Sequence, residues 1–117
     1  MDQSVKTKYL FKVICPRLNK VVILYEHTWR EHILPEHPEV SNYLRLIQGT
    51  IEKSDEQQDI WVKVKNQNKL CIVKRIPNFL PYNNYILVGL KICSDEMACV
   101  TSVYPVNELP PVGMKRL

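Results

Sequence analysis

The chain has 117 residues, 45% of them hydrophobic and 24% charged, which is ordinary for a soluble globular protein. This length allows one hydrophobic core but not two, so we expect a single domain over 1–117, with its core in 8–106 and a tail in 107–117. No apolar run approaches the roughly 20 residues of a membrane span, so no membrane contact is expected. Residues 1–6 lack the apolar stretch of a secretory signal. The net charge of +4 permits binding to a polyanion but does not require it.

Four cysteines are spread along the chain without a C-x-x-C pair: Cys15, Cys71, Cys93 and Cys99. Three of them lie in apolar, strand-like segments. Buried, reduced thiols explain this pattern better than disulfides or a metal site. Reduced thiols suit the cytoplasm, which is the location that we expect.

The first elements in chain order are two strands followed by two helices. Residues 8–14 and 20–25 are rich in aromatic and β-branched side chains, and the turn residues between them predict a β-hairpin. Thr28 and Glu31 form a T-x-x-E pattern, which predicts a capped short helix that Pro35 ends or kinks. Beyond Pro38, apolar residues at helical spacing predict an amphipathic helix of about four turns: Val40, Tyr43, Leu44, Ile47 and Ile51.

The second half of the chain changes to the two-residue period of strands. Segments 60–65, 70–76, 85–93 and 97–106 are predicted as strands, and the tail, with its two adjacent prolines, is not expected to continue the sheet. Successive strands with short connections predict an antiparallel meander. We therefore expect an α+β fold, in which an N-terminal β-hairpin is followed by one short and one long helix packed on a four-stranded antiparallel sheet.

All three histidines, His27, His32 and His37, fall in one short segment. Because histidine is the side chain most easily used for proton transfer near neutral pH, this segment is the first candidate for catalysis. A spacing of five does not place the three rings on one helical face, so a shared metal is not expected. No cofactor is expected either. Structural roles stay open: His32 as a surface residue bonded to Glu36, and His37 as a cap before the next helix.

Two parts of the sequence carry a resemblance to a known family. The first is a helix-opening Trp-x-x-His-Ile followed by His-Pro-Glu, and the second is a last strand with Thr101 before Tyr104-Pro105. Over about 21–106 the chain resembles the phage and bacterial barnase–EndoU–colicin–RelE-like ribonucleases, which are, or are predicted to be, metal-independent RNA-cleaving enzymes and often toxins. The resemblance places His32 and His37 on the family's histidine positions and Thr101 on its last-strand polar position. The chain departs from the family where Ser102-Val103 precede the aromatic residue.

Metal-free RNA cleavage needs a base for the 2′-OH, an acid for the leaving oxygen and a cation for the extra negative charge. His32 and His37 would fill the two proton-transfer roles, or Glu36 would replace one of them as the base. The candidate cations are Lys74, Arg75 and Arg30. Ser102 and Tyr104 share a strand face while Thr101 points away, so these residues line one site only if a bulge intervenes.

A second candidate surface lies on the strand predicted at 60–65. Trp61, Lys63 and Lys65 alternate onto one face, and aromatic plus basic residues on a sheet face are typical of single-stranded RNA binding. Lys74 is expected to add to it. The alternative is an exposed strand whose lysines keep the sheet edge soluble. Trp29 is expected to anchor the first helix to the core.

Three functions compete. The first is a small endoribonuclease acting on RNA, with an antitoxin protein as partner if the chain is a toxin. The second is a non-catalytic RNA- or protein-binding module in which the histidines do not matter. The third is a structural domain whose exposed strands pair in a homodimer.

Overall fold

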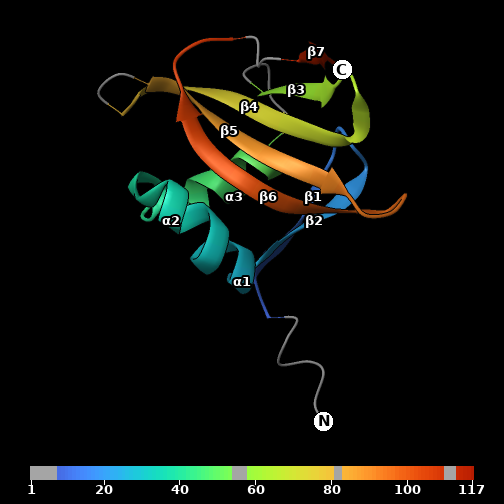
Figure 1. Ribbon diagram of the computed structural model, residues 1–117, viewed down its shortest axis with the longest axis horizontal. Coiled ribbons are helices and arrows are strands. Elements are labelled where there is room, and N and C mark those ends of the chain that lie inside the picture. Colours follow the sequence, from blue (N-terminus) through green and yellow to red (C-terminus); the bar gives the residue numbers. More distant parts are fainter. Residues whose placement is uncertain (1–7, 54–57, 81–82, 110–112) are drawn as a thin grey trace.

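The computed structural model describes residues 8–53, 58–80, 83–109 and 113–117, in which a sheet of seven strands wraps around a helix (Figure 1). The strand order is β1-β2-β6-β5-β4-β3-β7. All neighbouring strands are antiparallel except β2 and β6, which are parallel. The strands are β1 (Tyr9–Cys15), β2 (Lys20–Tyr25), β3 (Gln58–Lys63), β4 (Asn66–Leu80), β5 (Asn83–Ile92), β6 (Met97–Val106) and β7 (Met114–Arg116).

The expected α+β class is correct, but the expected four-stranded antiparallel sheet is wrong. The N-terminal hairpin joins the main sheet, because Val21–Ile23 of β2 pairs in parallel with Met97–Cys99 of β6. The amide of Val21 also donates to the carbonyl of Glu96 at 2.8 Å. This pairing satisfies backbone groups at the start of β6 that would otherwise form an open sheet edge.

The tail also contributes to the sheet, contrary to expectation. β7 pairs with β3, and the two flanking residues extend the pairing: Val64 donates to the carbonyl of Gly113 at 3.0 Å, and Leu117 donates to that of Ile60 at 2.8 Å. Gly113 has a φ of 72°, a conformation that glycine adopts without steric cost. The tail therefore covers the other edge of the sheet.

The histidine segment forms a chain of short helical turns between β2 and the longer helix. These are α1 (Glu26–Thr28), the π-helical turn η2 (Trp29–Ile33), α2 (Leu34–Glu36) and the 3₁₀ turn η3 (Pro38–Val40). The expected capping box is absent, because Thr28 is already helical and makes no side-chain cap bond. The amide of Leu34 bonds to the carbonyl of Trp29, five residues back, so a π turn directly precedes Pro35, which lacks an amide hydrogen.

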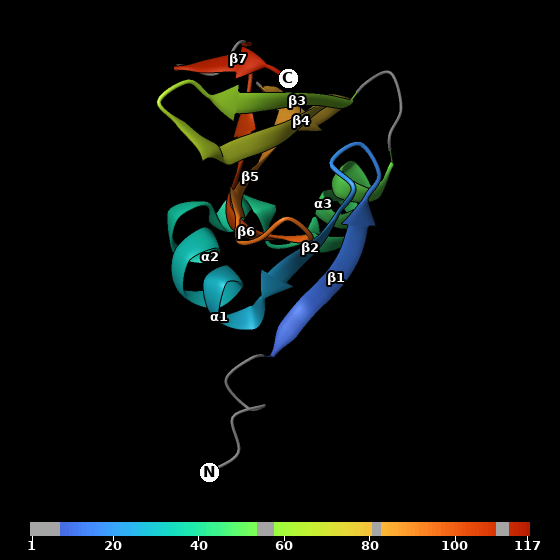
Figure 2. The ribbon, with the colours of Figure 1, turned by 90° about the vertical axis from the view of Figure 1, so that its right-hand side faces the viewer.

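The long helix is shorter than predicted. α3 spans Leu44–Glu52, and its predicted first turn is replaced by η3 and a turn. Figure 2 shows α3 enclosed by the curled sheet, with α1 and α2 beside β6. The main core lies here and includes these fully buried residues: Leu24, Ile47, Ile51, Ile60, Ile72, Ile86 and Val88. Among the described residues, no helix is long and apolar enough to cross a membrane.

The opposite face of the sheet carries a second, smaller apolar cluster of Trp61, Cys71, Val73 and Leu87. Tyr85, Tyr104 and Met114 pack against it. Side chains alternate along a strand, so each central strand buries one set of side chains in the main core and the other set in this second cluster. The candidate site lies on the second face, which we call the outer face.

Candidate functional site

The register of the central strands arranges the outer face in rows. Residues that face one another across antiparallel strands point to the same side of the sheet. The three central rows are Lys69–Lys91–Cys99, Cys71–Gly89–Ser102 and Val73–Leu87–Tyr104. Within these three rows, the two lysines lie at one end and the aromatic and aliphatic side chains at the other.

A β-bulge in β6 changes which side chains reach this face. The pairing passes from Gly89–Ser102 to Leu90–Val100, so Thr101 is an extra residue in β6. Thr101 and Ser102 consequently both line a cleft on the outer face, together with Tyr104. The bulge therefore allows Thr101, Ser102 and Tyr104 to line one site.

Gly89 forms the middle of the cleft floor. A Cβ atom added there would lie 2.2 Å from Oγ of Ser102, closer than any non-bonded contact allows. The missing side chain leaves room for the Ser102 hydroxyl, which lies over Gly89 between the lysine row and the apolar row. The cleft has a volume of about 860 Å³, within the range of pockets that hold small molecules or nucleotides.

Three lysines surround one part of this cleft. Lys63, Lys69 and Lys91 line it and are exposed, whereas Glu108 is the one carboxylate among the lining residues. Lys69 and Lys91 are direct cross-strand partners. Like charges in that position repel and destabilise a sheet, so an anionic ligand would relieve the repulsion.

Of the two predicted catalytic histidines, His37 lies next to a cleft residue. Its ring stacks on that of Tyr104, with centroids 5.3 Å apart and an angle of 23° between the planes. His37 Nδ1 is 3.1 Å from a carboxylate oxygen of Glu39. The backbone amide of Glu39 and the His37 ring hold the pKa of that carboxyl below its usual value. Burial, with a smaller contribution from Cys71, raises the pKa of Tyr104, which is therefore a neutral hydrogen-bond donor at pH 7.

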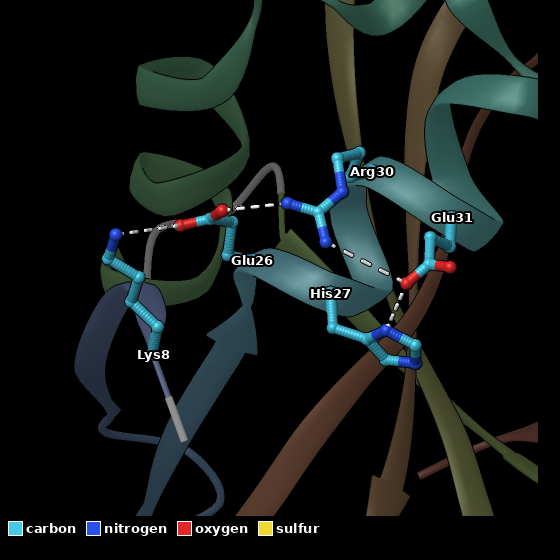
Figure 3. A network of polar contacts seen from close by, with 5 residues as sticks. All are labelled: Lys8, Glu26, His27, Arg30 and Glu31. Atoms are coloured by element: carbon cyan, nitrogen blue, oxygen red, sulfur yellow. Dashed lines mark hydrogen bonds and ion pairs between the residues drawn. The ribbon is translucent and has the colours of Figure 1, made fainter. Parts of the chain in front are cut away.

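The structure does not bring His32 and His37 together by any contact among the described residues. His32 packs edge-to-face against His27, with ring centroids 5.5 Å apart. Figure 3 shows the exposed polar network beside it, in which His27 Nδ1 bonds to Glu31. In the same network Arg30 bonds to Glu26 at 2.9 Å, so this candidate cation is already paired with a carboxylate (Figure 3).

The predicted RNA-binding stripe is not formed. Trp61 is only 8% exposed, and the guanidinium of Arg116 lies 5.1 Å from its ring centroid. Its indole nitrogen is buried with no hydrogen-bond partner among the described residues. Lys63 does line the cleft, whereas Lys65 lies in the turn after β3. The Arg116 guanidinium therefore lies over the ring on which an RNA base would have to stack.

The remaining predicted site residues lie outside the cleft. Arg75 is exposed and follows Val73 on the outer face, one row beyond Leu87 and Tyr104. Lys74 points to the other face of the same strand because side chains alternate. Glu36 is exposed at the end of α2. Trp29 packs against the main core, as expected for an anchor of the first helix.

Sequence reasoning missed Lys69, Lys91 and Gly89. Each lies in a segment that was predicted as a strand or next to one, but the two lysines become neighbours only through the β4–β5 register. A two-residue alternation of Lys69 with Cys71, and of Lys91 with Gly89, was the available signal. The described residues hold no group of three or more metal-ligating side chains.

Searches against protein-family models, curated proteins and solved structures found no match to this chain.

Proposed function

We propose that the chain binds single-stranded RNA in the cleft on the outer face of its sheet. The observation that carries the proposal is the opposed lysine pair, Lys69 and Lys91, at one end of a cleft whose other end is apolar and aromatic. Single-stranded RNA presents phosphates and flat bases within a few ångströms of each other, and proteins hold it with cations and stacking surfaces.

Each end of the cleft has a distinct part in this binding. Lys63, Lys69 and Lys91 contact phosphates, while Tyr104 and Leu87 contact a base at the apolar end of the cleft. Thr101 and Ser102 present hydroxyl groups between the two ends. Hydroxyls there reach the 2′-OH of ribose, which distinguishes RNA from DNA.

The test is a titration of a fluorescent single-stranded RNA at several salt concentrations. Lys69→Ala/Lys91→Ala should weaken binding at least tenfold and reduce the slope of log K against log salt by about 1.4, two contacts at about 0.7 each. The matched control is Lys12→Ala/Lys53→Ala, which removes the same charge from exposed positions outside the cleft. Equal losses in both variants would refute the cleft and leave only general attraction to a basic protein.

A second proposal is that the bound RNA is cleaved without a metal, as the family resemblance implies. The observation that favours it is the contact of His37 with Tyr104, because Tyr104 lines the cleft and His37 is held by Glu39. In this arrangement His37 takes the proton of the 2′-OH, the phenol of Tyr104 protonates the leaving 5′ oxygen, and the lysines hold the neighbouring phosphates. His32, Glu36 and Arg75 have no part in it, because they do not line the cleft and do not stack on a residue that lines it, as His37 does.

The assay is cleavage of end-labelled RNA in EDTA. Wild-type protein and His27→Ala, the matched histidine control, should both give products ending in 2′,3′-cyclic phosphate, and His37→Ala should give none. Binding without any cleavage would leave the RNA-binding module as the function. A toxin role with an antitoxin partner depends on the result of this assay. The free thiols suit a reducing, cytoplasmic location for the protein.

A further inference from the structure

Two of the four cysteines meet at the end of the β5–β6 hairpin. The Sγ atoms of Cys93 and Cys99 are 2.9 Å apart. Cys99 pairs with Lys91 across the two strands, and Cys93 follows Lys91 by two residues, so both thiols lie on the same side of the hairpin. A disulfide bond is about 2.05 Å long, so the sulfurs need to approach by about 0.9 Å.

This pair differs from the other two cysteines in accessibility. Cys93 is exposed and Cys99 is half-buried, whereas Cys15 and Cys71 are both buried. The Sγ of Cys71 contacts the sulfur of Met114 at 3.6 Å instead of another thiol. The expectation of buried thiols therefore holds for two cysteines, and the other two form an accessible couple.

We propose that Cys93 and Cys99 form a reversible intrachain disulfide that ties β5 to β6 beside the lysine row of the cleft. Cys99 faces Lys91 and precedes Thr101 by two residues, and both of these line the cleft. The crosslink fixes the hairpin end that carries Lys91. The disulfide forms regardless of which ligand the cleft binds, so this proposal does not depend on the proposed RNA binding.

The chemistry needs a two-electron oxidant, for which a peroxide suffices. The exposed Cys93 sulfur attacks one peroxide oxygen, the O–O bond breaks, and a sulfenic acid and one water result. The Cys99 sulfur then attacks the Cys93 sulfur, the S–O bond breaks, and a second water leaves. Two thiols and one hydrogen peroxide thus give one disulfide and two waters.

The order of the two thiols follows from their surroundings. Burial and the neighbouring Cys93 raise the pKa of Cys99 to about 11, although Lys91 lowers it slightly. Cys99 is consequently a protonated, half-buried thiol at neutral pH, and the exposed Cys93 meets the oxidant first. The Sγ of Cys99 already contacts the Sγ of Cys93, so it moves little when it attacks the oxidised sulfur.

The test is the mass of the full-length protein after treatment with one equivalent of hydrogen peroxide. The wild type should lose about 2 Da, the two thiol hydrogens, and dithiothreitol should restore them. Trypsin releases both cysteines in the single peptide 92–115, so the bond is located by a second cleavage after Glu96. The fragments 92–96 and 97–108, which carry Cys93 and Cys99, should stay joined until the disulfide is reduced.

Single variants separate this bond from other oxidation. Cys93→Ser and Cys99→Ser should not lose the 2 Da as monomers, whereas Cys15→Ala and Cys71→Ala should lose it as the wild type does. The proposal is overturned if the wild type gains oxygen atoms on Cys93 instead, if it forms disulfide-linked dimers, or if the crosslink involves Cys15 or Cys71.

Discussion

At the scale of single residues, Gly89 is the position where the cleft depends on the absence of a side chain. Replacing Gly89 by alanine puts a Cβ 2.2 Å from Oγ of Ser102 but at least 3.5 Å from every other atom. The clash is therefore with one hydroxyl. We expect Gly89→Ala to lower the free energy of unfolding by about 1–3 kcal/mol, as overpacking does, measured by urea denaturation.

A double variant isolates the cause of that loss. Ser102→Ala removes the clashing oxygen and leaves its Cβ 3.6 Å from the new methyl group, an ordinary contact. Gly89→Ala/Ser102→Ala should therefore recover most of the stability, giving a coupling energy of about 1 kcal/mol or more. If the two effects simply add, the loss of stability in Gly89→Ala does not come from a clash with the Ser102 hydroxyl.

The sequence indicated individual site residues but not how they combine. Thr101 and Tyr104 were both candidate site residues, but simple alternation placed them on opposite faces of the strand. Only the bulge in β6 brings them into one cleft. A bulge leaves no mark in a simple two-residue alternation. Trp61 was expected to be exposed because its strand alternates with lysines, but β7 covers it through a contact between distant segments.

At the scale of elements, the strand segments were predictable and their partners were not. Segments 20–25 and 97–106 were predicted with the bounds that the structure shows, because β-branched and aromatic residues fill them. The parallel pairing of β2 with β6 depends on the path of the intervening helical turns. Local patterns do not encode that path, so the sheet was expected with four strands instead of seven.

β7 is a short element whose role can be tested by removing it. It pairs with β3 and places Arg116 over the ring of Trp61. A chain ending at residue 112 should expose Trp61 at the sheet edge and lose about 1–3 kcal/mol of stability, because an apolar ring returns to water. In a Trp29→Phe background, the fluorescence maximum of Trp61 should move to longer wavelength.

The matched control for that truncation is Arg116→Ala. This variant keeps the β7 backbone and removes the side chain beyond Cβ, including the guanidinium over Trp61, so we expect a loss of about 0.5–1 kcal/mol and a smaller spectral shift. An unchanged emission maximum in the truncated chain would mean that Trp61 is buried by other segments and that β7 is dispensable.

At the scale of the whole molecule, the burial of thiols couples folding to alkaline pH. Burial raises the pKa of Cys15, and it raises that of Cys71 to about 12 and that of Cys99 to about 11. In the unfolded chain these thiols ionise near their ordinary pKa of about 8.5 to 9. Between the two values the folded protein holds more protons than the unfolded chain, so its stability falls as the pH rises.

Cys71 should dominate this dependence because burial raises its pKa to about 12, above the value of about 11 for Cys99. Its contribution is fully present below about pH 8 and declines through pH 12, by about 1 kcal/mol at pH 10. Urea unfolding at pH 8 and pH 10, with a phosphine reductant present to keep thiols free, measures it. Cys71→Ala should show a smaller loss between the two pH values, whatever its stability at pH 8. Cys93→Ala leaves Cys71 in place and should keep most of the wild-type loss, although it removes a thiol that helps to raise the pKa of Cys99. An equal loss in Cys71→Ala and in the wild type would show that ionisation elsewhere controls alkaline unfolding.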